Sequence, residues 1–386
     1  MKHPLLELGF RPFYLLAAVY AVFAVALWSG FLSGLVPVNA IAGGTAWHRH
    51  EMVFGFSSAV IAGFLLTAVK NWTGRTTANG PALAVLAGLW IAGRIFALSG
   101  PGAVAAFIDG LFLPMLAIAL AVPIWQSGNR RNIVVVVVVL ALAAANIVYH
   151  LAAAGEMDQN LARGSIFFAL DVITILMAII AGRVIPAFTK NAVVGANVRR
   201  NTAIEVLSIG TLVVIVLARG INVMYPLPSM AMAMLFGAAA LAHGIRLALW
   251  NPAATRGNML LAMLPIAYAW IPISLALMAL ASISLVPQSA AVHALTIGAM
   301  SSLMMAMMTR SSLGHTGRML KAGPIETAAF ILLQLATLAR VGSQTAWPSH
   351  YLESIMASAV LWALAFAIFL LRYLPILTRP GINAKA

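Results

Sequence analysis

Histidine is the side chain in this sequence best suited to bind a metal ion. The chain has 8 histidines and 0 cysteines, which excludes disulfides, iron–sulfur clusters, thiolate zinc sites and covalently attached haem. Neutral imidazole is the commonest metal ligand among side chains and binds both copper and haem iron. Four histidines fall at one face of the membrane topology derived below: His48, His50, His150 and His293. They predict a haem or metal site at that face.

Each histidine also has a simpler interpretation, as a solvated or helix-capping residue at the membrane interface. We keep that interpretation for His350, which stands beside Trp347 and Pro348. His48 and His50 cannot share one helical face, because positions i and i+2 diverge by about 200°. Either His48 lies in the preceding turn, or the two histidines serve different sites.

Charged residues inside apolar segments are costly and are therefore functional candidates. Arg94 and Asp109 lie at matching depth on neighbouring predicted helices, on either side of a tight turn at residues 99–102. This placement predicts a buried ion pair, and the alternative is that Arg94 meets a haem propionate or another anion. Asp171 lies near the middle of its segment and could deliver protons or bind a cation. Asp171 and Glu51 are the candidate catalytic groups.

Two polar clusters are predicted at the opposite, cytoplasmic face. Arg183 lies in the stretch 182–191, and Arg310, His315 and Arg318 lie in the stretch 309–318. Glycine-rich turns of this kind can present backbone amides to an anion. The alternative is a basic loop that faces anionic lipid.

The elements that position these residues are predicted to be membrane-spanning helices. The composition is 62% hydrophobic and only 8% charged, whereas a soluble protein carries about a quarter charged residues. A helix needs roughly 20 apolar residues to cross the hydrocarbon core. Twelve such segments are predicted: 10–35, 50–69, 81–99, 103–125, 132–153, 163–188, 203–219, 226–249, 259–284, 288–309, 324–341 and 351–374. We therefore expect an all-α, polytopic membrane protein forming one domain over residues 1–386, with no soluble domain and no internal repeat evident by inspection.

The basic residues orient these helices. Odd-numbered loops hold only Arg49, Arg163, Arg219 and Arg340, whereas most of the 23 lysines and arginines fall in the termini and the even-numbered loops. Because basic residues accumulate on the cytoplasmic side, we expect both termini in the cytoplasm. The net charge of +14 is thereby explained without a nucleic-acid partner.

Several motifs, in order along the chain, resemble the NnrS family. They are Trp47–Gly55 (WHRHEMVFG), Ala62–Ala68, Asn71–Gly74, Gly182–Asn191 (GRVIPAFTKN), His293–Ala299 and Met308–Arg318 (MTRSSLGHTGR). The resemblance implies a twelve-helix bacterial inner-membrane protein with haem and copper that protects against nitric oxide stress during denitrification. It also implies ligand histidines at His48, His50, His150, His293 and His315. One departure is Pro265, which stands where many relatives have a histidine.

The leading hypothesis is a haem-binding protein that binds nitric oxide or its adducts, with haem b and copper as cofactors. An electron donor would be a further partner beside the lipid bilayer. If the protein is an enzyme, it is an NO-directed oxidoreductase. Two alternatives remain open: a twelve-helix secondary transporter of a small anion or metabolite, and a haem-copper oxidase-like enzyme.

Overall fold

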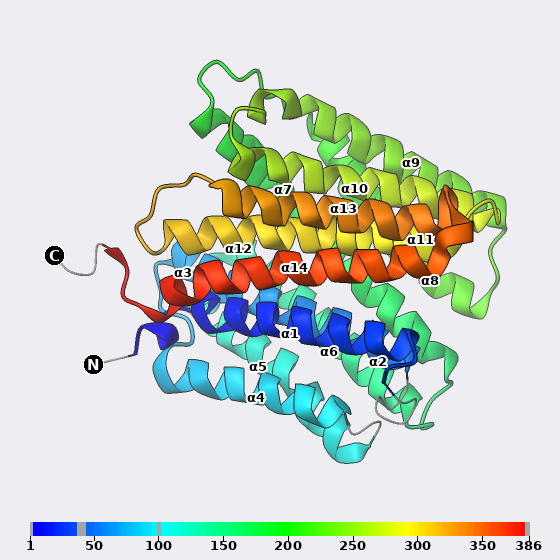
Figure 1. Ribbon diagram of the computed structural model, residues 1–386, viewed down its shortest axis with the longest axis horizontal. Coiled ribbons are helices and arrows are strands. Elements are labelled where there is room, and N and C mark those ends of the chain that lie inside the picture. The colour runs from blue at the N-terminus through cyan, green and yellow to red at the C-terminus, as the bar shows by residue number, and fades with distance from the viewer. Residues whose placement is uncertain (1–2, 37–43, 99–101, 383–386) are drawn as a thin grey trace. The chain divides into compact units, whose positions relative to one another are not determined.

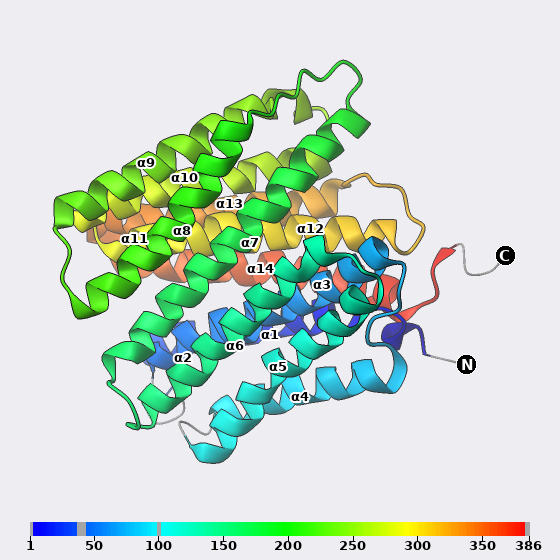
Figure 2. The same cartoon turned by 180° about the vertical axis from the view of Figure 1, so that it is seen from behind.

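The protein is an all-α membrane protein. The computed structural model describes residues 3–36, 44–98 and 102–382, and within these ranges it contains helices and turns but no strand. Twelve helices among them are long and apolar enough to cross a membrane (Figures 1 and 2). In hydrocarbon every backbone N–H and C=O must be bonded within its own segment, which is why such apolar sequences are helical. The predicted fold class and the twelve spans are confirmed.

The spans agree with the predicted segments to within a few residues at most ends. In chain order the twelve spans are Phe10–Leu32 (α1), Thr45–Thr73 (α2, η3 and α3), Gly80–Leu98 (α4), Ala103–Gln126 (α5), Arg130–Ala153 (η4 and α6), Asn160–Ala192 (α7), Thr202–Met224 (α8), Ser229–Leu249 (α9), Met259–Ser282 (α10), Gln288–Gly314 (α11, η6 and α12), Pro324–Thr345 (α13) and Pro348–Thr378 (η7 and α14). The predicted turn at residues 99–102 lies, apart from Gly102, outside the described residues.

The sequence suggested regular α-helices for spans 2 and 10. The structure shows that each contains a π-helix. Span 2 is built from α2 (Thr45–His50), the π-helix η3 (Glu51–Ser57) and α3 (Ser58–Thr73), and span 10 from α11 (Gln288–His293), the π-helix η6 (Ala294–Ser301) and α12 (Ser302–Gly314). Two serine hydroxyls bond carbonyls at the same i−5 spacing as the π-helical backbone. Ser57 donates to the Met52 carbonyl and Ser301 to the Thr296 carbonyl. Long π-helices are rare in proteins, and those that occur often lie at functional sites.

The chain divides into two compact units. Unit 1 comprises residues 1–172, 311–319 and 366–386, and unit 2 comprises residues 173–310 and 320–365. The single domain expected from the sequence remains a prediction.

In unit 1, α5 contacts both α4 and α6, and α3 packs against α1 and α5 (Figure 2). Arg11 fastens the C-terminal end of α14 to α1, since its Nη1 donates to the carbonyls of Leu377 at 2.9 Å and Arg379 at 2.7 Å. Cationic donors at a helix C-terminus satisfy carbonyls that have no partner within the helix. This packing brings α2, α4, α5 and α6 around one polar cluster.

Candidate metal site

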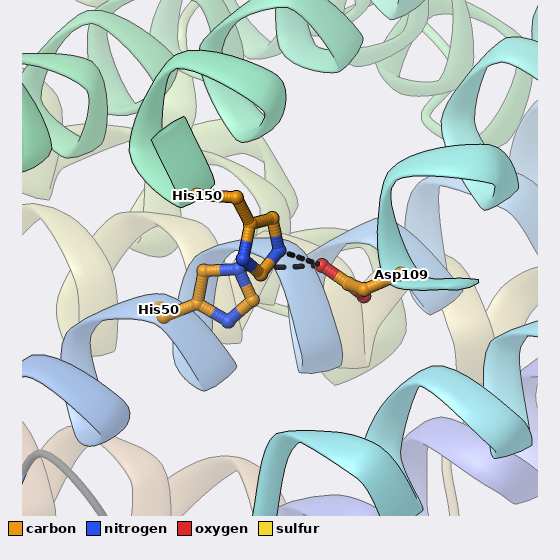
Figure 3. A group of neighbouring side chains, drawn as sticks. All are labelled: His50, Asp109 and His150. Atoms are coloured by element: carbon orange, nitrogen blue, oxygen red, sulfur yellow. Dashed lines mark hydrogen bonds and ion pairs between the residues drawn. The ribbon is translucent and has the colours of Figure 1, made fainter. Parts of the chain in front are cut away.

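Three residues from three helices of unit 1 converge on one point. His50 ends α2, Asp109 lies on α5 and His150 lies near the end of α6 (Figure 3). One ligand atom from each lies within 4.8 Å of the other two. Two imidazoles and a carboxylate at such spacing could hold a metal ion.

The contacts inside this triad are short and buried. His150 Nε2 lies 2.8 Å from Asp109 Oδ2, and His50 Nε2 lies 3.4 Å from the same oxygen. His50 and Asp109 each expose only 3% of their surface. The two imidazole rings have centroids 5.0 Å apart. A single small ion therefore suits this space.

A second carboxylate and an arginine support the triad. His50 Nδ1 donates to Glu51 Oε1 at 2.7 Å, and Arg94 Nη1 donates to Glu51 Oε2 at 2.7 Å. Arg94 Nη2 forms an ion pair with Asp109, and Tyr20 donates its hydroxyl hydrogen to Glu51. The predicted Arg94–Asp109 pair is confirmed. Since both terminal nitrogens of Arg94 already bond carboxylates, a haem propionate would have to displace one of them.

Asn146 completes the cluster, and the sequence reading missed it. Its Nδ2 donates to Asp109 Oδ2 at 2.8 Å, so its carbonyl oxygen faces His50 Nε2 at 2.9 Å. Asn146 precedes His150 by one helical turn on α6, and this spacing could have indicated a shared face. A polar residue one turn from a candidate ligand was the available signal.

The cluster carries more negative than positive fixed charge. Glu51 and Asp109 face one guanidinium, Arg94, and Glu51 is fully buried. An uncompensated charge is expensive in an apolar interior. The remaining negative charge would be offset by a proton on one of these groups or by a metal ion.

The π-helix and its glycine make this arrangement possible. A Cβ at Gly55 would lie 2.7 Å from Arg94 Nη1 and 2.9 Å from a ring carbon of Tyr20. Trp90 donates its indole N–H to the Gly55 carbonyl at 3.1 Å. Only a glycine lets α4 bring its arginine so close to Glu51, because any larger side chain would occupy the same volume.

The other predicted ligands do not join this triad. The His48 ring stacks on Trp28 of α1, with centroids 4.6 Å apart and an interplanar angle of 11°. His48 and His50 therefore have different neighbours, although both lie on α2. His293 belongs to unit 2, where its Nδ1 donates to the Ser289 carbonyl at 2.7 Å. Such a bond leaves Nε2 as the nitrogen with a lone pair.

His315 lies at the other end of unit 1 from the triad. Its ring lies 5.6 Å from that of Phe10, and the Phe10 N–H bonds Thr67, which is 17 residues or about 25 Å along span 2 from His50. Burial, with a contribution from Lys70, lowers the pKa of His315. His315 therefore belongs to a separate region, as expected from the sequence.

The remaining predicted residues are spread over both units. Asp171 lies on α7 in unit 1 and is not among the residues of the cluster. In unit 2 the Arg310 guanidinium stacks over the Phe188 ring at 3.6 Å, and Arg183 is half-buried on α7. Arg318 of unit 1 donates to the Thr316 carbonyl at 3.4 Å. The polar site predicted around these residues stays a prediction.

Unit 2 contains a buried polar network that sequence reading did not anticipate. Arg246 donates from Nη2 to Glu205 at 2.5 Å, and from Nη1 to the Tyr268 hydroxyl at 3.0 Å and the Ala178 carbonyl at 2.9 Å. His243 bonds Tyr268 at 2.6 Å. A Cβ at Gly182 would collide with the guanidinium. Gly182, which opens the motif 182–191, is therefore explained by the close approach of Arg246.

The comparisons with known proteins agree with this description. The family model described as NnrS protein matches residues 4–380. No curated protein matches the chain. The matched range covers all twelve spans and every residue of the triad and its supporting cluster. The chain therefore belongs to the NnrS family.

Proposed function

We propose that the protein is a metal-binding membrane protein of the nitric oxide response and that it binds nitric oxide or its adducts. The observation that carries the proposal is the buried triad of His50, Asp109 and His150, whose ligand atoms lie within 4.8 Å of one another. The surplus negative charge of Glu51 and Asp109 over Arg94 gives this triad a preference for a cation. Membership of the NnrS family supports the nitric oxide response.

The donor atoms fit copper or non-haem iron. Imidazole nitrogens suit Cu, Fe and Zn, and two histidines with one carboxylate is a recurrent iron-binding set that leaves coordination positions open. A redox-active ion held in this way would supply a site for NO and one-electron chemistry. Copper agrees with the family resemblance, and we assign it to the triad.

The protein's own residues would hold the triad in position. Glu51 accepts a hydrogen bond from His50 Nδ1 and thereby directs His50 Nε2 toward Asp109. Asn146 and Arg94 bond the two oxygens of Asp109. Partners of this kind orient ligands and raise metal affinity. Glu51 is thus a positioning residue, whereas Asp171 remains the candidate for proton delivery.

Haem b would bind elsewhere in the chain. The triad's rings converge too closely to admit a porphyrin between them. Among the remaining histidines, His293 would be suited to hold it through Nε2, since its Nδ1 hydrogen is held by a backbone carbonyl. His48 and His315 are the further candidates.

We place the protein in the bacterial inner membrane with the triad near the periplasmic face, where an electron donor would have access to it.

A visible absorption spectrum of the purified full-length protein, recorded before and after addition of NO, tests this function. We expect a Soret band that shifts with NO, together with copper or iron in metal analysis. A colourless protein without iron or copper, after expression with ample haem and metal, would contradict the proposal and favour a transporter.

A further inference from the structure

Basic side chains gather in unit 1 where α1, α3 and the segment after α12 meet. Phe10, the first residue of α1, touches both neighbours: its N–H donates to the Thr67 hydroxyl at 3.2 Å, and its ring lies 5.6 Å from the ring of His315. Lys70 follows Thr67 by about one turn on α3. Burial lowers the pKa of His315, and the charge of Lys70 lowers it further. The ammonium group and the imidazole are therefore close enough to interact.

Arg318 is carried by a tight turn beside His315. Gly317 has a left-handed backbone, with φ of 77°, a conformation that glycine adopts without strain. The N–H of Arg318 donates to the Leu313 carbonyl at 2.9 Å, and the Thr316 carbonyl accepts the N–H of Ile382 at 3.0 Å. The turn is thus fixed by backbone bonds to the end of α12 and to the C-terminal segment.

No carboxylate neutralises this group of cations among the residues that the structure describes. Glu7, in the bend before α1, forms its ion pair with Arg11 at 3.4 Å. The charge of Arg318 acts on the same arginine. Lys70, His315 and Arg318 have no ion pair with a carboxylate within the described ranges. The positive charge at this end of unit 1 is therefore in excess.

Most hydrogen-bond donors of these side chains are not used within the described part of the chain. Lys70 is half-buried, and its ammonium group donates no hydrogen bond there. Arg318 uses a single terminal nitrogen, which donates to the Thr316 carbonyl at 3.4 Å. His315 is exposed, and a neutral imidazole has one N–H to donate. Ammonium, guanidinium and imidazole donors thus come together from two separate segments.

We propose that Lys70, His315 and Arg318 bind an anionic phosphate group at the predicted cytoplasmic face of unit 1. A half-buried ammonium group on an apolar helix is costly without a counter-charge, and a bound anion removes that cost. Hydrogen bonds from lysine and arginine to phosphate are charge-assisted and about twice as strong as neutral ones. Lys70 lies 20 residues, or about 30 Å, along span 2 from His50. The phosphate site does not depend on metal at the triad.

The phosphate group could belong to a small soluble phosphate or to the headgroup of an anionic lipid in the cytoplasmic leaflet. The experiment uses purified full-length protein in a neutral detergent and measures the melting temperature in two titrations. The first compares sodium phosphate with sodium chloride at equal ionic strength. The second compares short-chain phosphatidylglycerol with short-chain phosphatidylcholine, whose choline cancels the phosphate charge. Haem content is measured in parallel on each preparation.

The variants separate this site from general charge effects. The double variant Lys70→Gln, Arg318→Gln removes both permanent charges of the site, and His315→Ala removes the imidazole. Arg131→Gln is the matched control, because it removes an exposed positive charge from the same predicted face of unit 1.

For a soluble phosphate we expect saturable stabilisation of the wild type by phosphate but not by chloride. For a lipid headgroup, phosphatidylglycerol stabilises the wild type more than phosphatidylcholine does, and inorganic phosphate has no effect. In either case the apparent affinity falls about tenfold or more in the double variant, falls less in His315→Ala, and is unchanged in Arg131→Gln.

The proposal is overturned if neither ligand stabilises the wild type beyond its control. It is also overturned if the double variant, eluting as a folded monodisperse peak, keeps the wild-type affinity, or if Arg131→Gln loses as much affinity as the double variant. Loss of haem in His315→Ala would assign this histidine to haem and overturn the three-residue site. None of these results alters the copper content expected at the triad, so the two proposals fail separately.

Discussion

Arg94 Nη1 lies 2.7 Å from Glu51 Oε2, and both side chains are buried in unit 1. The same guanidinium pairs with Asp109 through its other terminal nitrogen. Arg94 thus joins the carboxylate that orients His50 to the carboxylate of the triad. One cation holds two anions together in an interior where neither is stable alone.

Replacing Arg94 by glutamine should destabilise the protein by about 3–5 kcal/mol, because it leaves two buried carboxylates without their counter-charge. The measurement is the free energy of unfolding in detergent. The double variant Arg94→Gln with Glu51→Gln should recover part of the loss, since it removes one of the stranded charges. Equal stability of Arg94→Gln and wild type would mean that the ion pairs contribute little.

The packing of the second π-helix predicts a steric effect at Gly298. A Cβ there would lie 2.5 Å from Trp270 Cγ and 2.9 Å from Thr337 Cγ2. We expect Gly298→Ala to lose about 1–3 kcal/mol through overpacking. Gly237 of α9 is the matched control, because a Cβ there would meet nothing within 4 Å and alanine is the better helix former. If Gly298→Ala and Gly237→Ala have the same melting temperature, the close packing is wrong.

The network of unit 2 predicts that Tyr268→Phe is destabilising. The hydroxyl bonds both His243 Nδ1 at 2.6 Å and Arg246 Nη1 at 3.0 Å, and its removal leaves a buried nitrogen of His243 without that partner. The expected loss is about 1–3 kcal/mol. Tyr225→Phe, at an exposed position, serves as the control and should be neutral in the same unfolding assay.

The absence of cysteine makes the predicted topology directly testable. Gln159→Cys lies in the loop between α6 and α7, and Asn197→Cys in the loop between α7 and α8; both positions are exposed. If both termini are cytoplasmic, a membrane-impermeant maleimide labels Gln159→Cys in intact spheroplasts and labels Asn197→Cys only after permeabilisation. Labelling in the reverse order would invert the topology.

Much of the fold was predictable because hydrocarbon leaves few alternatives to a helix. Runs of about 20 apolar residues identified the spans, and the matching depths of Arg94 and Asp109 identified their ion pair. The two π-helices were not predictable, since residues 51–57 and 294–301 have no periodicity that separates them from an α-helix. What accompanies them is tertiary: Gly55 and Gly298 each pack closely against neighbouring spans.

The site was predictable only in part for the same reason. Grouping histidines by membrane face correctly brought His50 and His150 together, but depth alone could not exclude His48, whose ring turns to Trp28. Asn146 was not predicted because its amide is uncharged, and the sequence argument considered ionisable residues in apolar segments.

The metal content of the purified protein tests the central claim most directly. Wild type should contain about one copper ion per chain at the triad, beside any haem iron, because three ligands and a surplus negative charge converge there. His50→Ala with His150→Ala, and separately Asp109→Asn, should lose that ion, whereas His350→Ala, at an exposed position, should keep it. Wild-type metal content in the His50→Ala, His150→Ala variant would contradict the account.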